Sequence, residues 1–193
     1  MDKHKKLQLL QKKLERIKNL PLISSKEDVV FGEGNPDATV MFIGEAAGYW
    51  ESVKRRPFVG PSGKVLDRLI ESIGLVRSEV YITSVIKSRP PNNRDPKPEE
   101  IEAHSPYLDA QIEIIGPKII VTLGRFSLNK FLPDVKISQV HGKPFKIIWQ
   151  GKQRVVIPMY HPAAGLRRIE VMKKLKKDFK IIKKILDKLR KSR

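Results

Sequence analysis

Short β-branched runs alternate with longer amphipathic stretches along this 193-residue chain, and this alternation restricts the fold more than any other feature. The runs at residues 38–44, 79–87 and 118–124 predict buried strands, each followed by a glycine- or proline-containing segment. Between them, residues 64–70 and 98–115 place apolar side chains at helical spacing. This order predicts an α/β fold, a three-layer α/β/α sandwich around a mainly parallel central sheet.

The remaining segments fit the same architecture and show no internal repeat. We expect one domain that spans residues 1–193, because a hydrophobic content of 40% suffices for one substantial core. We expect amphipathic helices at residues 2–18 and from 170 onward, and a hairpin at 143–160 that leads into a last core strand. A short strand within 28–37 and a short helix at 127–132 are the remaining elements.

Three loops follow strands and should meet at one edge of the sheet, where open α/β sheets bind ligands. They cover residues 44–63, 88–95 and 161–168. In the first, two alanines between Gly44 and Gly48 let the backbone approach a planar ligand.

The same first loop carries side chains that suit a ligand. Phe58 offers a stacking face, and Glu45 and Glu51 offer carboxylates. An alternative interpretation of this glycine motif alone is a surface connection around a buried phenylalanine.

The charge of the chain points to a polyanionic partner. Thirty-nine Lys and Arg residues face 21 Asp and Glu residues, a formal net charge of +18. Nucleic acid is the first expectation and an anionic membrane the second, and the alternative is a lysine-rich surface that serves solubility. No apolar run approaches transmembrane length and no signal-peptide pattern occurs, so we expect a cytoplasmic protein that does not enter membranes.

The chain contains no cysteine. Disulfides, thiolate metal sites and cysteine nucleophiles are therefore excluded, and any catalysis must use carboxylates, histidine or the backbone. A composition rich in Lys, Glu and Ile without Cys is also typical of thermophiles.

Four motifs occur in order: Gly44-Glu-Ala-Ala-Gly48, Arg56-Pro-Phe-Val-Gly60, Lys87-Ser-Arg-Pro-Pro-Asn-Asn-Arg94 and His161-Pro-Ala-Ala164. Together they resemble the motifs of the uracil-DNA glycosylase superfamily, nearest to family 4, the iron–sulfur type of archaea and thermophilic bacteria. The resemblance runs from about Asn19 to Arg168. It implies an enzyme that flips a deaminated base, uracil or a deaminated purine, out of DNA and hydrolyses its N-glycosidic bond.

The resemblance also implies roles for individual residues. Gly44, Ala46, Ala47 and Gly48 would hold the attacking water and contact the flipped base, and Phe58 would stack on it. His161 would donate a hydrogen bond to the base oxygen that gains charge as the bond breaks.

Two acidic positions of the first motif are matched by Glu45 and Glu51. A carboxylate there orients water or stabilises an oxocarbenium-like sugar, while plain solvated charge is the alternative for Glu51. The predicted DNA contacts are Ser62 and Gly63 to phosphate, Arg89 and Arg94 in the loop at 88–95, and Leu166, Arg167 and Arg168 where the family places its DNA-wedging loop. Leu166 is the preferred wedge, although an ordinary helix-start leucine fits equally well.

The chain departs from the family at the cluster. Family 4 enzymes hold a 4Fe-4S cluster with four cysteines, and the matching positions here are Ile17, Leu20, Ser88 and His104. We therefore expect no cluster, no metal and no other cofactor, with apolar packing around the helix that bears His104 in its place. A metal-binding role for His104 is disfavoured because three partners are missing.

A second departure concerns recognition of the base. Ser84 stands where the family has an asparagine that reads the uracil edge, and a serine hydroxyl replaces neither the donors nor the fixed plane of an amide. Ala47 stands where the family has a proline, and we expect this alanine to loosen the loop that holds the water. These changes motivate a second hypothesis, a catalytically weak or inactive DNA-lesion-binding protein of the same fold.

A third hypothesis, a nucleotide-binding α/β protein of another class, rests on the glycine loop alone, since no Walker motif or dinucleotide fingerprint is present. The core motifs contain no obvious lysine for a lyase step, although Lys54 and Lys87 lie nearby in sequence. We expect a monofunctional glycosylase that acts as a monomer, with a sliding clamp as one conceivable protein partner.

Overall fold

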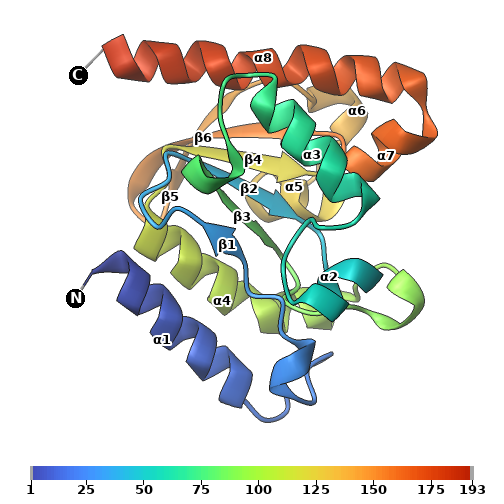
Figure 1. Ribbon diagram of the computed structural model, residues 1–193. Helices are drawn as coiled ribbons and strands as arrows, with labels where there is room; N and C mark the ends of the chain where they lie inside the picture. Colours follow the sequence, from blue (N-terminus) through green and yellow to red (C-terminus); the bar gives the residue numbers. More distant parts are fainter. Residues whose placement is uncertain (1, 192–193) are drawn as a thin grey trace.

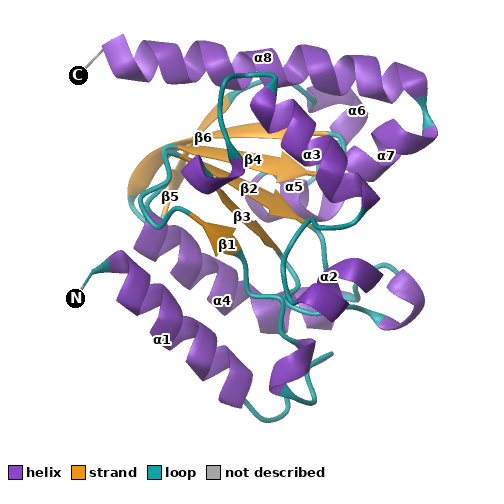
Figure 2. Ribbon diagram, viewed as in Figure 1, coloured by secondary structure: helices purple, strands orange, loops and turns teal. Residues whose placement is uncertain are grey.

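The computed structural model describes residues 2–191. In this part of the chain six strands form one sheet, in the order β1-β3-β2-β4-β6-β5 (Figures 1 and 2). The strands are β1 (Glu33–Gly34), β2 (Val40–Gly44), β3 (Tyr81–Ser84), β4 (Ile119–Leu123), β5 (Phe145–Trp149) and β6 (Lys152–Met159). The four central strands are parallel and the two edge strands pair antiparallel, which confirms the predicted mainly parallel sheet.

Helices cover both faces of the sheet, as Figure 1 shows. On one face lie α3 (Pro61–Glu71), α7 (Pro162–Arg167) and α8 (Ile169–Lys191), and on the other lie α1 (Lys3–Arg16) and α4 (Pro98–Ile115). Shorter elements complete the fold: α2 (Tyr49–Lys54), α5 (Arg125–Phe131), α6 (Ile137–Val140) and the 3-10 turns η1 (Lys26–Asp28), η2 (Arg77–Glu79) and η3 (Pro91–Asn93).

The core has two layers because side chains alternate across each strand. Along β2, Val40 and Phe42 pack against α3 and α8, whereas Met41 and Ile43 pack against α1 and α4. The Phe42 ring stacks on Phe179 of α8 with centroids 5.8 Å apart. Both faces of the strand are buried, which explains its uninterrupted apolar sequence.

Sequence signals fix the ends of the long helices. The Asp2 side chain accepts a hydrogen bond from the Lys5 amide and caps α1. Pro98 opens α4, and Gly116 closes it in the left-handed conformation at a φ of 65°.

The structure differs from the sequence-based expectations in three short segments. Val29, Val30 and Phe31 are buried but lie outside any strand, and the first strand is the two-residue β1. The strand expected at 79–87 is only β3, followed by buried bends.

The third difference is in the rim loops. The segments expected as loops at 44–63 and 161–168 contain the helices α2 and α7. Helix α2 starts after Gly48 and stops where Arg55 turns left-handed, at a φ of 53°. Helix α7 has Pro162 at its first position and His161 as its cap.

The chain order brings the functional candidates to one edge. The connection from β2 to β3 carries α3 on one face, and the connection from β3 to β4 returns past β2 carrying α4 on the other face. Ligands bind at such a switch point, beyond the carboxyl ends of the strands. Gly44, Gly124 and Tyr160 directly end or follow β2, β4 and β6 at this edge.

Candidate active-site cleft

A cleft of about 660 Å³ opens at the carboxyl edge of the sheet. Most of the predicted site residues line it: Glu45, Ala46, Ala47, Gly48, Glu51, Phe58, Ser62, Arg94, His161, Arg167 and Arg168. The other lining residues are Pro90, Asn93, Asp95, Tyr160, Ala163, Ala164 and Val171. The three rim segments thus meet around one space large enough for a base and part of its sugar.

The floor of the cleft is tied by backbone hydrogen bonds to residues 85–88, the segment that follows β3. Val85 and Ile86 amides donate to the carbonyls of Gly44 and Glu45. The Ala47 amide donates to the Ser88 carbonyl at 3.2 Å, a bond that a proline at this position could not make. Ala47 therefore anchors the loop through its own N–H group.

The two acidic residues of the loop occupy different environments. Burial, reinforced by Asp95, raises the pKa of Glu45 to about 7, while Arg125 opposes the shift. Glu51 is 8% exposed, and its Oε1 accepts hydrogen bonds from the Val59 and Gly60 amides at 2.9 and 2.8 Å. Glu51 thus holds the turn after Phe58. The Glu45 carboxyl group, by contrast, forms no hydrogen bond or ion pair with any residue that the structure describes.

Two rings form one wall of the cleft. The rings of Phe58 and His161 stack with centroids 5.5 Å apart and an interplanar angle of 27°. Phe58 is buried although its φ is 50°, in the left-handed region that disfavours side chains other than glycine. Arg77 offsets this strain by donating to the carbonyls of Pro57 and Phe58.

The hydrogen bonding of His161 identifies its tautomer. Its Nδ1 accepts from the Ala163 amide at 3.1 Å, so the proton of the neutral ring resides on Nε2. Burial lowers the pKa of His161 to about 4; Glu51 opposes this shift and Arg167 adds to it. At neutral pH the side chain is therefore an uncharged donor.

Cations surround the mouth of the cleft. Arg94 is paired with Glu100 through two hydrogen bonds, and Arg125 is paired with Asp95. Arg167 and Arg168 form no ion pair with the residues that the structure describes, so both remain available to an anion.

Five predicted residues lie outside the lining of the cleft, and two of them are glycines with a spacing role. A Cβ on Gly63 would lie 1.9 Å from the Phe58 carbonyl oxygen, and a Cβ on Gly44 would lie 2.6 Å from the Phe58 ring. Both glycines therefore make room for Phe58. The Ser84 hydroxyl lies behind the cleft, 3.3 Å from that same Cβ position on Gly44, and the residue is buried.

The other two face outward. Leu166 on α7 is 52% exposed, as a wedge would be. Arg89 lies over the ring of Tyr49, 5.2 Å from its centroid.

Sequence reasoning missed Tyr160, Asn93, Asp95 and Arg77. The first three belong to or adjoin quoted motifs, so their position in the rim loops was a usable signal. Arg77 lies in η2, far along the chain from Phe58, and no local pattern reveals that contact.

The two lysines near the motifs do not face the cleft. Lys87 is fully buried, and its Nζ donates to Thr83 Oγ1, the Ser84 carbonyl and Gln111 Oε1 at 2.6–2.7 Å. Burial, with a smaller contribution from Lys130, holds its pKa well below the usual value. Lys54 is exposed on α2 and does not line the cleft.

The four positions that match cluster cysteines do not fit an iron–sulfur cluster. Ile17 and Leu20 are apolar, and the buried Ser88 hydroxyl has no hydrogen-bond partner. His104 Nδ1 accepts from the Lys87 amide at 3.1 Å, and its Nε2 donates to the Pro21 carbonyl at 2.8 Å. Within residues 2–191, no group of three or more His, Cys, Asp or Glu side chains could hold a metal ion.

His104 does what a cross-link would do in this place. It joins the segment after α1 to the segment after β3, which in turn holds Ala47 of the cleft through the Ser88 carbonyl. The expected apolar packing is also present, since Leu20 and Ile17 belong to the core layer of α4.

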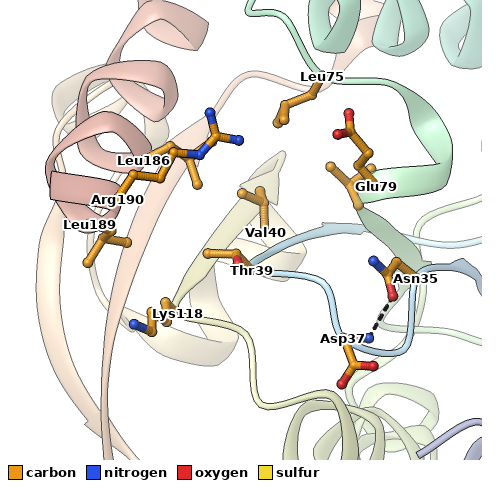
Figure 3. Close-up of a pocket in the computed structure, with 11 residues that line it drawn as sticks. Asn35, Asp37, Thr39, Val40, Leu75, Glu79, Lys118, Leu186, Leu189 and Arg190 are labelled. Carbon is orange, nitrogen blue, oxygen red and sulfur yellow. Dashed lines mark hydrogen bonds between the residues drawn. The ribbon is translucent and has the colours of Figure 1, made fainter. Parts of the chain in front are cut away.

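A second pocket, of about 240 Å³, lies at the opposite edge of the sheet (Figure 3). It combines Asp37 and Glu79 with Lys118 and Arg190 above an apolar floor, and Asp37 is paired with Lys3. These balanced charges select no class of ligand.

In the described part of the chain no helix combines the length and apolarity needed to cross a membrane.

Comparisons with known proteins agree with the geometry. Residues 31–190 match the family model described as the Uracil DNA glycosylase superfamily. A protein of Sulfurisphaera tokodaii named type-4 uracil-DNA glycosylase is 45% identical over 185 residues, 93% of this chain and 84% of the relative. Proteins with the same name from Archaeoglobus fulgidus and Saccharolobus solfataricus are 48% and 44% identical, over 83% and 93% of this chain and 83% and 86% of their own lengths.

Proposed function

The chain belongs to the uracil-DNA glycosylase superfamily and is a DNA glycosylase, and we propose that it excises uracil from DNA by hydrolysis. The arrangement that carries this proposal is the pairing of a stacking ring, Phe58, with an uncharged donor, His161, in one cleft. We propose deaminated purines as a second candidate substrate class, since the cleft has room for either kind of base.

The cleft residues divide the work of base extrusion and bond cleavage. Flipping a base costs a few kcal/mol, and stacking on Phe58 together with phosphate contacts around Ser62 and Arg167 offsets this cost. As the glycosidic bond breaks, negative charge builds up on the base. The Nε2–H group of His161 donates to the developing anion, and its fixed position lowers the barrier.

Glu45 is our choice for the carboxylate that orients the attacking water. It lines the cleft, and its raised pKa matches a group that exchanges protons near neutral pH. Glu51 contributes through the Val59 and Gly60 amides, which position the wall beneath Phe58.

The reaction ends at hydrolysis. A lyase step needs an uncharged amine beside the sugar, and Lys87 directs its amine into the core, where Thr83, Ser84 and Gln111 accept its hydrogen bonds. We expect an abasic site without strand cleavage as the product.

Single-turnover assays on one purified preparation test the substrate class. Matched duplexes would carry uracil, hypoxanthine or xanthine, and alkali-sensitive abasic product would be measured for each. Product from the uracil duplex supports the proposal, and additional product from the purine duplexes would widen the substrate class. Tight binding without product on any duplex would favour the lesion-binding alternative, which the Ser84 substitution motivates.

We also propose that the enzyme works without an iron–sulfur cluster, because none of the four matching positions offers a thiolate and both nitrogens of His104 are engaged. A preparation grown in iron-supplemented medium should be colourless and iron-free by elemental analysis, with activity unchanged by chelators. Stoichiometric iron with visible absorption would contradict this. Monomeric state, cytoplasmic location and a sliding-clamp partner stay predictions from the sequence.

A further inference from the structure

Helix α2 exposes three large apolar side chains on the rim of the cleft. Tyr49, Trp50 and Val53 are 53%, 51% and 60% exposed. Within residues 2–191, eight large hydrophobic residues are about half exposed or more, and a six-residue helix carries three of them. Contiguous exposed apolar surface of this kind marks an interaction site more often than scattered single residues do.

The aromatic side chains form an ordered arrangement with a cation. The rings of Tyr49 and Trp50 meet edge to face, with centroids 5.2 Å apart and an interplanar angle of 76°. The guanidinium of Arg89 lies over the Tyr49 ring, and Arg89 Nε donates to Asn93 Oδ1 at 2.8 Å. Because Asn93 lines the cleft, the arrangement is connected to the wall of the proposed active site.

The arrangement of Tyr49, Trp50 and Arg89 adjoins residues that we propose contact the DNA strand. Gly48, the N-cap of α2, and Glu51, within the helix, both line the cleft. Trp50 lies beside Gly60, with its Cδ1 3.4 Å from where a Cβ on Gly60 would be, two residues before Ser62. Figure 1 shows α2 beside the carboxyl ends of the central strands, where the cleft opens.

We propose that Tyr49, Trp50 and Arg89 form a stacking surface for an unpaired base next to the flipped nucleotide, an inference that rests on the proposed function. Exposed aromatic rings with an adjacent arginine are how proteins hold single-stranded nucleic acid without reading its sequence. The net charge of +18 favours a nucleic acid over a protein segment as the occupant. Bases within a duplex are already stacked, so the surface favours single-stranded or locally melted substrate.

Trp50 itself reports on the contact. The chain has two tryptophans, and Trp149→Phe leaves Trp50 as the only one. Titration with a uracil-free thymine oligonucleotide should quench the Trp50 emission in a saturable way, and an equal concentration of blunt duplex should quench it much less. Quenching by the duplex alone, or none by either DNA, would overturn the proposal.

Affinity measurements in the otherwise native protein give a second readout. Trp50→Ala should weaken single-strand binding about tenfold with an unchanged salt slope, and Trp50→Phe should retain most of the affinity. Arg89→Gln should reduce the salt slope by about 0.7. Ile148→Ala is the matched control, because this β5 residue is 71% exposed on another part of the sheet, and it should change neither quantity.

These outcomes separate the inference from the proposed function. If the wild-type protein excises uracil while Trp50→Ala binds single strands as tightly as the wild type, the stacking surface is wrong and the glycosylase function stands. If no uracil is excised, binding of the uracil-free oligonucleotide still tests the surface on its own.

Discussion

Among single residues, the two groups that carry most of the proposed chemistry have pKa values shifted in opposite directions. Burial raises the pKa of Glu45 to about 7 and lowers that of His161 to about 4. Glu45 must be ionised to orient water, so we expect the single-turnover excision rate to rise with pH through about 7. Asp95→Asn should move this midpoint to lower pH, because it removes a neighbouring negative charge.

Substitution of His161 distinguishes the two groups. His161→Ala removes the donor to the developing anion and should lower the rate by about 10²–10³, with the midpoint near pH 7 retained. A midpoint that disappears with His161 would instead assign the titration to the histidine and refute the role of Glu45. Circular dichroism of the variant controls for folding.

The substitution Ser84→Asn tests how the base edge is read. A planar amide restored at the end of β3 should favour uracil over deaminated purines by roughly 10–100-fold, equivalent to about 1–3 kcal/mol. Phe58→Ala is the contrasting variant: loss of the stacking face should slow excision of every base and leave the ratio nearly fixed. An unchanged rate and ratio in a folded Ser84→Asn protein would show that Ser84, which is buried behind Gly44, does not reach the base.

The sequence was a good guide to which residues approach the cleft, and a poorer guide to what each of them does there. Glu45 and Glu51 looked equivalent in the motif, and only the folded chain reveals that Glu51 binds the Val59 and Gly60 amides. The left-handed Phe58 and its support by Arg77 were equally hidden, since they depend on a contact across 19 residues.

At the level of elements, His104 connects three segments through two hydrogen bonds. His104→Ala leaves the Lys87 amide and the Pro21 carbonyl without partners, and we expect the free energy of unfolding to fall by about 2–4 kcal/mol in urea titrations. His104→Gln, whose amide can both accept and donate, should lose clearly less. Equal losses in both variants would mean that packing, and not hydrogen bonding, is what His104 supplies.

The same bridge should make stability depend on pH. Burial lowers the pKa of His104 below the 6.5 of an unfolded histidine, while the Pro21 carbonyl opposes the shift. Its contribution is therefore present above pH 6.5 and is lost as pH falls through the folded value, where protonated Nδ1 can no longer accept from Lys87. Urea titrations of wild type and His104→Gln should diverge above pH 6.5 and converge in acid.

Element prediction succeeded where periodicity was long and failed where it was short. The strands β2 and β4 and the helices α1, α4 and α8 follow apolar repeats that the sequence displays. Helix α2 was not predicted because its six residues expose Tyr49, Trp50 and Val53, so no buried apolar stripe indicates a helix there. Residues 29–31 have the composition of a strand, yet the segment after β3 bends there, and the Val30 amide donates to the Lys87 carbonyl without a regular ladder forming.

Over the whole molecule, α8 carries ten exposed Lys and Arg residues, follows the cleft residue Arg168 and runs along one face of the sheet (Figure 1). DNA affinity should therefore fall steeply with salt, with a log–log slope of roughly −0.9 per phosphate neutralised. The double variant Lys177→Gln, Lys184→Gln should flatten the slope, and Lys12→Gln, Lys13→Gln on α1 should leave it unchanged. Slopes that respond equally to both pairs would show that the charge acts without a defined footprint.

The packing of α8 has a consequence for how the protein is made. Leu175, Phe179, Ile182 and Leu186 cover the face of the sheet that Phe42 occupies, yet they follow every strand of that sheet along the chain. At roughly 5–20 residues per second, the ribosome needs about one to five seconds to add the 23 residues of this helix. During that interval the face of the sheet that Phe42 occupies has no cover from α8, so this half of the core is completed only after α8 has been made.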